Sequence, residues 1–409
     1  MHQPQDLRDS VGRKLALISI VEGPELQPES AFLAGSARLL GLVPQRVATD
    51  FGTPGEMFQA QLKALDPVGV LLPYATEFRE VLLVLAELAR KNVQGPVAFV
   101  GDAVGRERLP VHDLEGVTWI SGDPGAGLAE ALHGSPSGAP DHASIPMDLA
   151  PYGADLASRP MVASLFGELG TVGLLATRAA RSELSPVALL ARLEAPVAEG
   201  PVALDPEIAL APLDFLDDKV QRVEWWDRHA TAHVLDCAEA LSSRGLRQSV
   251  RVRVDLATPE LLASLPGRGV DRVVFDVDRV AEVPAVPGSN GSVEALRPWA
   301  QVARDLGLEI GLNVVVGLPD ETPEAGRARR ALLGTLAPDR MRCVPFEPTG
   351  GTDAHDWIEG RGLLAPKKTR WERELHRPIV QDCLPPDAFW QTWSDALCGL
   401  AEVEMRRRT

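Results

Sequence analysis

This chain of 409 residues lacks three features, and each absence excludes a class of protein. It has no apolar run of the roughly 18 residues that a membrane-spanning helix needs. It has no excess of basic charge, and its net charge of −16 argues against nucleic acid and anionic membranes as partners. Its first residues, MHQPQDLRDSVGRK, lack the apolar centre of a signal peptide. We therefore expect a cytoplasmic protein that binds neither nucleic acid nor membrane.

The cysteines are few and scattered singly. No C-x2-C pair is present, whereas zinc and iron–sulfur sites normally need clustered thiolates, because two close ligands fix the geometry for the rest. We interpret the thiols as buried or inert in a reducing cytosol and predict no metal site. They belong to Cys237, Cys343, Cys383 and Cys398.

The first part of the chain alternates apolar strands with amphipathic helices. KLALISIV, at 14–21, is a continuous apolar run, which is typical of a parallel strand buried on both faces. Further strands are predicted over 67–76, 96–102 and 116–123, with helices over 29–41, 77–92 and 125–132. This α/β order predicts a Rossmann-like, doubly wound domain over residues 1–133. The stretch 134–165, rich in Gly, Pro and Ser, is interpreted as a linker.

The alternation resumes at Thr171 with a different rhythm. Strands are predicted from Thr171 and over 209–218, 248–256, 271–280, 308–319 and 339–348, with helices over 185–195, 223–245, 258–269, 292–307 and 322–337. Crossovers of this length join parallel strands, so residues 166–365 are predicted to form a partial (β/α)6 barrel. The remaining sequence does not supply the two further units of an eight-stranded barrel. Residues 366–409 are predicted to form a helical extension.

The barrel strands carry a set of polar residues that we expect to face the lumen. Alternate residues of a barrel strand point inward and outward, and the apolar set must meet the surrounding helices. The inward set comprises Arg253, Asp255, Asp276, Asp278 and Asn313, with Asp214, Asp217 and Asp218 at the end of the 209–218 strand. Ligands bind at the carboxyl ends of such strands.

Two interpretations of this set stay open. In one, the lumen is a site for a polar ligand. In the other, Arg253 pairs with an Asp of a neighbouring strand and the charges only satisfy one another. Desolvation offsets most of the attraction in a buried ion pair, so stability alone is a poor reason to bury so many charges. The first interpretation is favoured.

Several stretches, taken in their order along the chain, resemble the cobalamin-binding radical S-adenosylmethionine (SAM) family over residues 14–365. LGLEIGLNVVVGLPDET resembles the family's fifth barrel strand, FLDDKV the end of the second, and CVPFEPTGGT the sixth. RVRVDLATPELLASL resembles a further motif, which carries over Arg253 and Asp255. Asp278, in FDVDRV, takes the place of an acidic residue that reaches the SAM ribose in the family.

The resemblance implies that SAM and cobalamin are the ligands to test. The cofactor-binding candidates are Asp217, Asp218, Arg253, Asp278, Asn313 and Gly317. The D-x-H-x-x-G motif of a histidine cobalt ligand is missing, but some members of the family bind cobalamin without it. Both cofactors therefore remain open for this chain.

One departure from the family changes the expected chemistry. The family's C-x3-C-x2-C loop after the first barrel strand holds an iron–sulfur cluster, and Ala179, Ala180, Arg181 and Ser182 stand there instead. That cluster delivers an electron to SAM and chelates its methionine end. We therefore expect neither the cluster nor radical SAM chemistry.

Two functional hypotheses follow. In the first, the protein binds a ligand or partner without catalysis in a specialised biosynthetic pathway, its partner being a small-molecule or peptide intermediate or an active homologous enzyme. In the second, it is a non-radical transferase, for example a methyltransferase using SAM or methylcobalamin. Asp255, Asp276 or Asp278 is then the general base and His355 reaches the barrel mouth. His229 and His233, spaced i, i+4 on the predicted 223–245 helix, are interpreted as surface or packing residues rather than metal ligands.

Overall fold

The chain forms two α/β units in its computed structural model, and each is described by itself. The structure describes residues 12–20, 28–49, 55–73, 79–100, 117–120, 128–129, 161–162, 166, 168, 170–174, 176–178, 202–215, 220–227, 229–280, 285–286, 291–346, 353–363, 398 and 403. The first unit is Met1–Ala163 with Thr177–Pro186 and Glu199–Lys219, and the second is Ser164–Ala176 with Val187–Ala198 and Val220–Thr409. None of the described helices has the length and apolarity needed to cross a bilayer.

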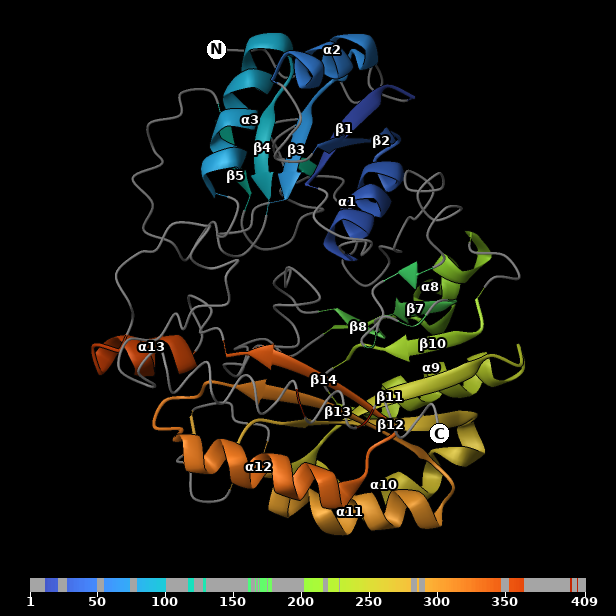
Figure 1. Cartoon of the computed structure of the whole chain (residues 1–409). Coiled ribbons are helices and arrows are strands. Elements are labelled where there is room, and N and C mark those ends of the chain that lie inside the picture. Colours follow the sequence, from blue (N-terminus) through green and yellow to red (C-terminus); the bar gives the residue numbers. More distant parts are fainter. Residues whose placement is uncertain are drawn as a thin grey trace. The chain divides into compact units, whose positions relative to one another are not determined.

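The first unit contains a parallel five-stranded sheet in the order β2-β1-β3-β4-β5 (Figure 1). Its strands are β1 (Lys14–Ile20), β2 (Val43–Thr49), β3 (Val70–Pro73), β4 (Val97–Val100) and β5 (Val117–Ile120). Its helices are α1 (Pro28–Leu39), α2 (Gly55–Leu65) and α3 (Arg79–Asn92). Two separate apolar clusters, one with residues of α1 and one with residues of α2 and α3, pack against the sheet. The predicted Rossmann-like fold is confirmed.

Two elements of the first unit were not predicted, the strand β2 and the helix α2. β2 lies at the edge of the sheet, and its sequence VPQRVAT includes polar residues that are only half-buried. An edge strand is shielded on fewer sides than a central one, so it lacks the continuous apolar run that identified β1. The predicted 125–132 helix lies largely outside the described residues.

The second unit contains a sheet whose strands lie in the order β14-β13-β12-β11-β10-β7. These strands are β7 (Thr171–Leu174), β10 (Arg222–Trp225), β11 (Arg247–Arg253), β12 (Val270–Val277), β13 (Glu309–Val316) and β14 (Arg340–Pro345). From β7 to β14 every neighbouring pair is parallel, which is the predicted half-barrel. The helices are α9 (Ala232–Ser242), α10 (Pro259–Ser264), α11 (Val293–Asp305), α12 (Pro323–Leu336) and α13 (Asp353–Gly360) (Figure 1).

Local sequence signals fix where these helices begin. Thr258, Ser292 and Thr322 each accept a hydrogen bond from the backbone N–H three residues later, at 3.1 to 3.2 Å. Such N-caps satisfy backbone donors that the helix itself leaves unpaired. Pro259 and Pro323 follow in the first turn, where a missing N–H costs nothing. The predicted helices over 258–269, 292–307 and 322–337 are confirmed.

Two adjacent predictions were wrong. Residues 209–218 were expected to form a strand, but α8 (Pro206–Leu210) and the 3-10 helix Ala211–Phe215 occupy their described part. Asp205 caps this helical turn by accepting the Glu207 N–H at 2.9 Å, and Pro206 favours its start. The second barrel strand is instead β10, which begins at Arg222 and overlaps the start of the predicted 223–245 helix.

The segment 223–245 therefore divides into a strand, a turn and a helix. Val223 and Trp225 alternate with Arg222 and Glu224, and α9 begins only after its N-cap Thr231. The apolar spacing of this segment also fits a helix, which is why periodicity alone misassigned it.

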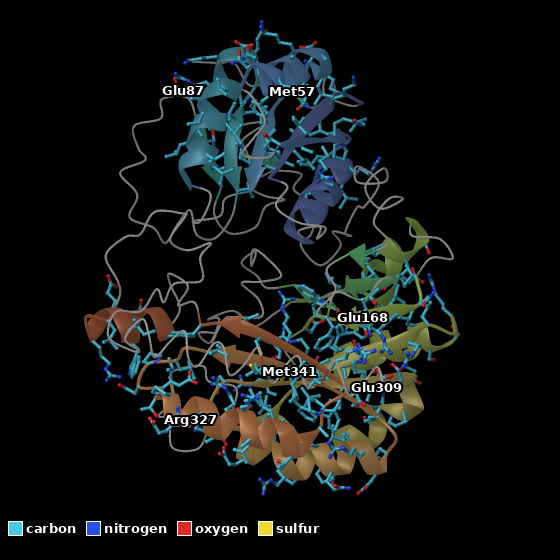
Figure 2. All side chains as sticks on the ribbon, viewed as in Figure 1. Met57, Glu87, Glu168, Glu309, Arg327 and Met341 are labelled. Atoms are coloured by element: carbon cyan, nitrogen blue, oxygen red, sulfur yellow. The ribbon has the colours of Figure 1, made fainter. Side chains whose placement is uncertain are left out.

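The amino end of the half-barrel is closed by the segment that leads into β7. Phe166 lies against β13: a Cβ added to Gly311 would lie 2.8 Å from the Phe166 ring. Glu168 accepts hydrogen bonds from Arg272 at 2.7 Å and from Arg340 at 2.6 Å, and Arg272 also pairs with Glu309 at 2.8 Å. Figure 2 shows Glu168 and Glu309 close together in the second unit. Ligand access is thus expected from the carboxyl ends of the strands.

Candidate functional site at the carboxyl ends of the barrel strands

Parallel register brings the predicted inner-face residues onto one surface. Arg253 of β11 is in register with Asp276 of β12, which is in register with Asn313 of β13. Partners in register point to the same side of a sheet. The three strands therefore contribute neighbouring polar side chains, as the alternation of their sequences predicted.

The centre of this surface is a buried ion pair. Arg251 donates to Asp276 at 2.6 Å, and the two side chains are 2% and 0% exposed. The other Asp276 oxygen accepts the Asn313 amide at 3.1 Å, and Arg251 also donates to the Trp226 carbonyl at 3.1 Å. Both oxygens of Asp276 are thus engaged, which suits a carboxylate that holds its neighbours in place rather than a general base.

Arg253 and Asp255 form a second pair, nearer the solvent. β11 ends at Arg253, and Asp255 lies in the following 3-10 turn, Val254–Leu256, instead of on the predicted strand. Arg253 donates twice to Asp255, at 2.9 and 2.6 Å, and about half of the Asp255 side chain is exposed. Arg253 therefore bonds to a residue two positions further along the chain. It is Arg251, and not Arg253, that pairs with an Asp of the neighbouring strand.

Asp278 follows the end of β12 and is fully buried. Its carboxylate accepts the Gly291 N–H at 3.4 Å, and its own N–H donates to the Gly291 carbonyl at 3.2 Å. These contacts join the end of β12 to the segment that leads into α11. The ribose-binding role that the family resemblance gave to Asp278 stays a prediction.

Gly317 follows β13 and adopts φ +87°, a conformation that L side chains rarely reach. The Glu321 carboxylate accepts the N–H groups of Gly317 and Leu318 at 2.8 and 3.2 Å. Glu321 also pairs with the buried Arg329 of α12 at 2.5 Å. The GLPDET turn is thus held rigidly, and Glu321 is a supporting residue that the sequence interpretation missed.

His229 is the second residue that the sequence interpretation missed. It lies between β10 and α9 at the carboxyl end of the sheet, and not on a helix. Its Nδ1 accepts the Arg253 N–H at 3.3 Å, and burial together with the nearby Arg253 guanidinium lowers its pKa. The alternation of RVEW indicates a strand, and the residues that follow a barrel strand reach the site. This signal could have identified His229.

The remaining predicted site residues are placed as follows. Asp217 and Asp218 lie outside the described residues. His355 lies on α13, whose buried Ala354 and Ile358 form an apolar cluster with Val315 of β13 and Val344 of β14. The carboxyl ends of β10 to β12 are therefore polar, whereas those of β13 and β14 are covered by apolar side chains.

The described residues do not fit an iron–sulfur cluster. Cys237 is buried on α9, and Cys343 lies on β14, where burial raises its pKa to about 11. Among the described residues no group of three or more His, Cys, Asp or Glu side chains could hold a metal ion. The donor set that a cluster needs is therefore not assembled in this part of the chain.

Fold and site together define the class of protein: an α/β protein with a Rossmann-like sheet and a parallel half-barrel that has polar groups at the carboxyl ends of its strands. Solved structures share this fold. One is the radical SAM methyltransferase TsrM from Kitasatospora setae with cobalamin and a [4Fe-4S] cluster bound, with a TM-score of 0.60 and 14% identity over 87% of this chain and 80% of TsrM.

A second similar structure is the cobalamin-dependent SAM radical enzyme OxsB with aqua-cobalamin and SAM bound. Its TM-score is 0.55 at 12% identity, over 85% of this chain but only 55% of OxsB. No model of a known protein family matches the chain, and no curated protein sequence matches it. At such low identity the likeness concerns the fold.

Proposed function

We propose that this protein binds SAM, or a ligand of similar chemistry, at the carboxyl ends of its barrel strands and does not cleave it by radical chemistry. It would act as a ligand-binding or partner protein, a pseudo-enzyme, in a specialised biosynthetic pathway. The observation that carries the proposal is a half-barrel with a polar mouth in a chain whose cluster loop reads LATRAARS and contains no cysteine. Without three thiolates, neither the electron nor the metal chelate of radical cleavage is supplied.

The described residues have the chemistry to bind such a ligand. A ribose needs hydrogen-bond acceptors, and Asp278 is a carboxylate at the end of β12. An amino-acid group needs both charges, and the Arg253–Asp255 pair presents both in one partly exposed place. The buried Arg251–Asp276–Asn313 cluster would keep β11, β12 and β13 in fixed register beneath the ligand.

Cobalamin binding by the first unit is part of the proposal, and the shared fold supports it. TsrM and OxsB were both solved with cobalamin bound. In doubly wound sheets ligands bind outside the carboxyl ends of the strands. Most residues following β1, β3, β4 and β5 lie outside the described residues, so no residue of this chain is assigned to cobalamin.

A second candidate is polar methyl transfer, with Asp255 as general base. Of the three predicted carboxylates, Asp255 is the most exposed, whereas Asp276 and Asp278 are fully buried. A base must reach the proton that it removes. If this candidate is right, Asp255→Asn abolishes methyl transfer even at saturating SAM, while SAM binding weakens only about tenfold through the lost charge; a variant that retains turnover removes Asp255 from this role.

Calorimetric titration with SAM tests the proposal. We expect saturable binding by the wild-type protein, weakened about tenfold in Arg253→Ala and Asp278→Asn, since a lost hydrogen bond to a charged group costs about 1.5 kcal/mol or more. Arg327→Ala is the matched control, because Arg327 is exposed on α12 and pairs only locally with Glu324. Absence of both binding heat and a thermal shift for the wild-type protein would rule out the SAM-dependent versions.

Absorption spectroscopy tests the cofactors. After anaerobic incubation with iron and sulfide we expect no cluster absorption, and a stoichiometric cluster would overturn the non-radical proposal. A corrin spectrum after incubation with cobalamin supports its binding, and a colourless protein after gel filtration contradicts it.

A further inference from the structure

His229 is held in one orientation by the backbone of a neighbouring strand. The Arg253 N–H, at the end of β11, donates to Nδ1 of His229 at 3.3 Å. The His229 carbonyl in turn accepts the Thr231 N–H at 2.8 Å, which closes a tight turn just before α9. Ring and backbone are both fixed, so the position of the second ring nitrogen is determined by the fold.

This contact also fixes the tautomer of the ring. A backbone N–H can only donate, so Nδ1 is the acceptor and carries no proton. The pKa of His229 is lowered, first by burial and next by the Arg253 guanidinium, with Asp255 acting weakly in the opposite direction. The ring is therefore neutral near pH 7, and its single proton lies on Nε2.

The Nε2–H of His229 has no hydrogen-bond acceptor among the described residues. A second donor at the carboxyl end of β10 also lacks an acceptor there. The indole N–H of Trp226, which directly follows β10, is buried and has no hydrogen-bond partner in the part of the chain that the structure describes. Both groups donate and cannot accept. The carboxyl end of β10 therefore presents two donors without an acceptor in the described part of the chain, whereas the nearby Asp227 carboxylate already accepts the Ala176 N–H at 2.8 Å.

We propose that His229 binds the ligand of the barrel as a hydrogen-bond donor, through Nε2, to an acceptor oxygen of a carboxylate. A base at this position would need the proton on Nδ1, which would break the bond from the Arg253 N–H. The neighbouring guanidinium of Arg253 favours an anionic acceptor. This role of His229 rests on the proposed ligand site. It adds that His229, with its proton on Nε2, recognises the ligand.

A pair of substitutions separates the two ring nitrogens. Asn can place an amide oxygen near the position of Nδ1, and Gln can place an amide N–H near that of Nε2. We expect His229→Gln to bind SAM within about threefold of wild type. His229→Asn should keep the wild-type melting temperature but bind SAM about tenfold more weakly, because the donor is lost. Equal SAM affinity of the Asn variant and the wild type would overturn the proposal.

Nitrogen-15 NMR of histidine-labelled protein tests the tautomer without SAM. His229→Gln assigns the signal, which should have the pattern of a ring protonated on Nε2 between pH 6 and 8. Saturating SAM should shift Nε2 more than Nδ1. If wild-type protein does not bind SAM, the proposed function fails, and acetate becomes the carboxylate probe: a selective Nε2 shift then supports the role of His229. A ring protonated on Nδ1, or an Nε2 signal that neither probe moves, overturns it.

Discussion

At the scale of residues, the inner-face charges divide into two groups with different surroundings. Arg251 and Asp276 are buried and bonded to each other across two strands, whereas Arg253, Asp255 and His229 are partly exposed at the mouth. The central charges satisfy one another, although through Arg251 and not through Arg253. That the outer charges bind a ligand stays a prediction.

The central pair gives the first stability prediction. Asp276→Ala leaves the Arg251 guanidinium buried without its counter-charge, and it should lower the free energy of unfolding by about 3–5 kcal/mol. Asp305→Ala is the control, since Asp305 is exposed on α11 and should change stability by less than about 0.5 kcal/mol. Urea unfolding measures both. Equal unfolding midpoints for Asp276→Ala and Asp305→Ala would show that the Arg251–Asp276 pair does not stabilise the pairing of β11 and β12.

At the scale of elements, the sequence predicted best where caps and periodicity agreed. Helices α10, α11 and α12 begin at the predicted residues, because Thr258, Ser292 and Thr322 cap them locally. The 209–218 strand and the 223–245 helix failed because short apolar runs fit either period, and only pairing with β7 and β11 makes β10 a strand.

Gly311 offers a test of how β13 packs. A Cβ there would meet the Phe166 ring at 2.8 Å and Val274 at 3.0 Å, so Gly311→Ala should lower the free energy of unfolding by about 1–3 kcal/mol. Adding Phe166→Leu should restore part of that loss. Gly334→Ala on α12 is the control: no described residue lies within 4 Å of a Cβ added there, and the substitution should stabilise by about 0.5–1 kcal/mol. Stabilisation by Gly311→Ala would contradict the packing of Phe166.

At the scale of the whole molecule, the chain forms two α/β units, each with its own main sheet, and segments of the two units alternate along the chain between residues 164 and 219. In the second unit, contacts far apart in sequence join the two ends of the sheet. Glu168, just before β7, bonds to Arg272 of β12 and Arg340 of β14. This acidic residue thus ties the start of the half-barrel to its last strand.

Glu168 should make the second unit sensitive to acid. Despite opposing burial, hydrogen bonds and charge attraction from Arg272 and Arg340 lower its pKa from 4.5 to about 2. A carboxyl group whose pKa is lower in the folded state stabilises the fold at any pH above its unfolded pKa. This stabilisation is lost as the pH falls toward the folded pKa, so roughly 3 kcal/mol of the free energy of unfolding should disappear between about pH 4.5 and 2.

Two variants isolate this effect by chemical unfolding. Glu168→Gln should lower stability at pH 7 and flatten the acid dependence, whereas Glu359→Gln, exposed on α13, should preserve both. The same acid slope in wild type and Glu168→Gln would assign the effect to other carboxyls.

The sequence by itself determined the alternation of strands and helices, the inward polar set on β11, β12 and β13, and the cysteine-free loop after β7. These depend on local periodicity and composition. Only the tertiary structure decided that Arg251 pairs with Asp276, that Arg253 pairs with Asp255, and that His229 lies at the mouth. Arg251 meets Asp276 through the register between two strands, which hydrogen bonding across the sheet sets and no local pattern encodes. Arg253 meets Asp255 because β11 ends at Arg253 and a 3-10 turn follows.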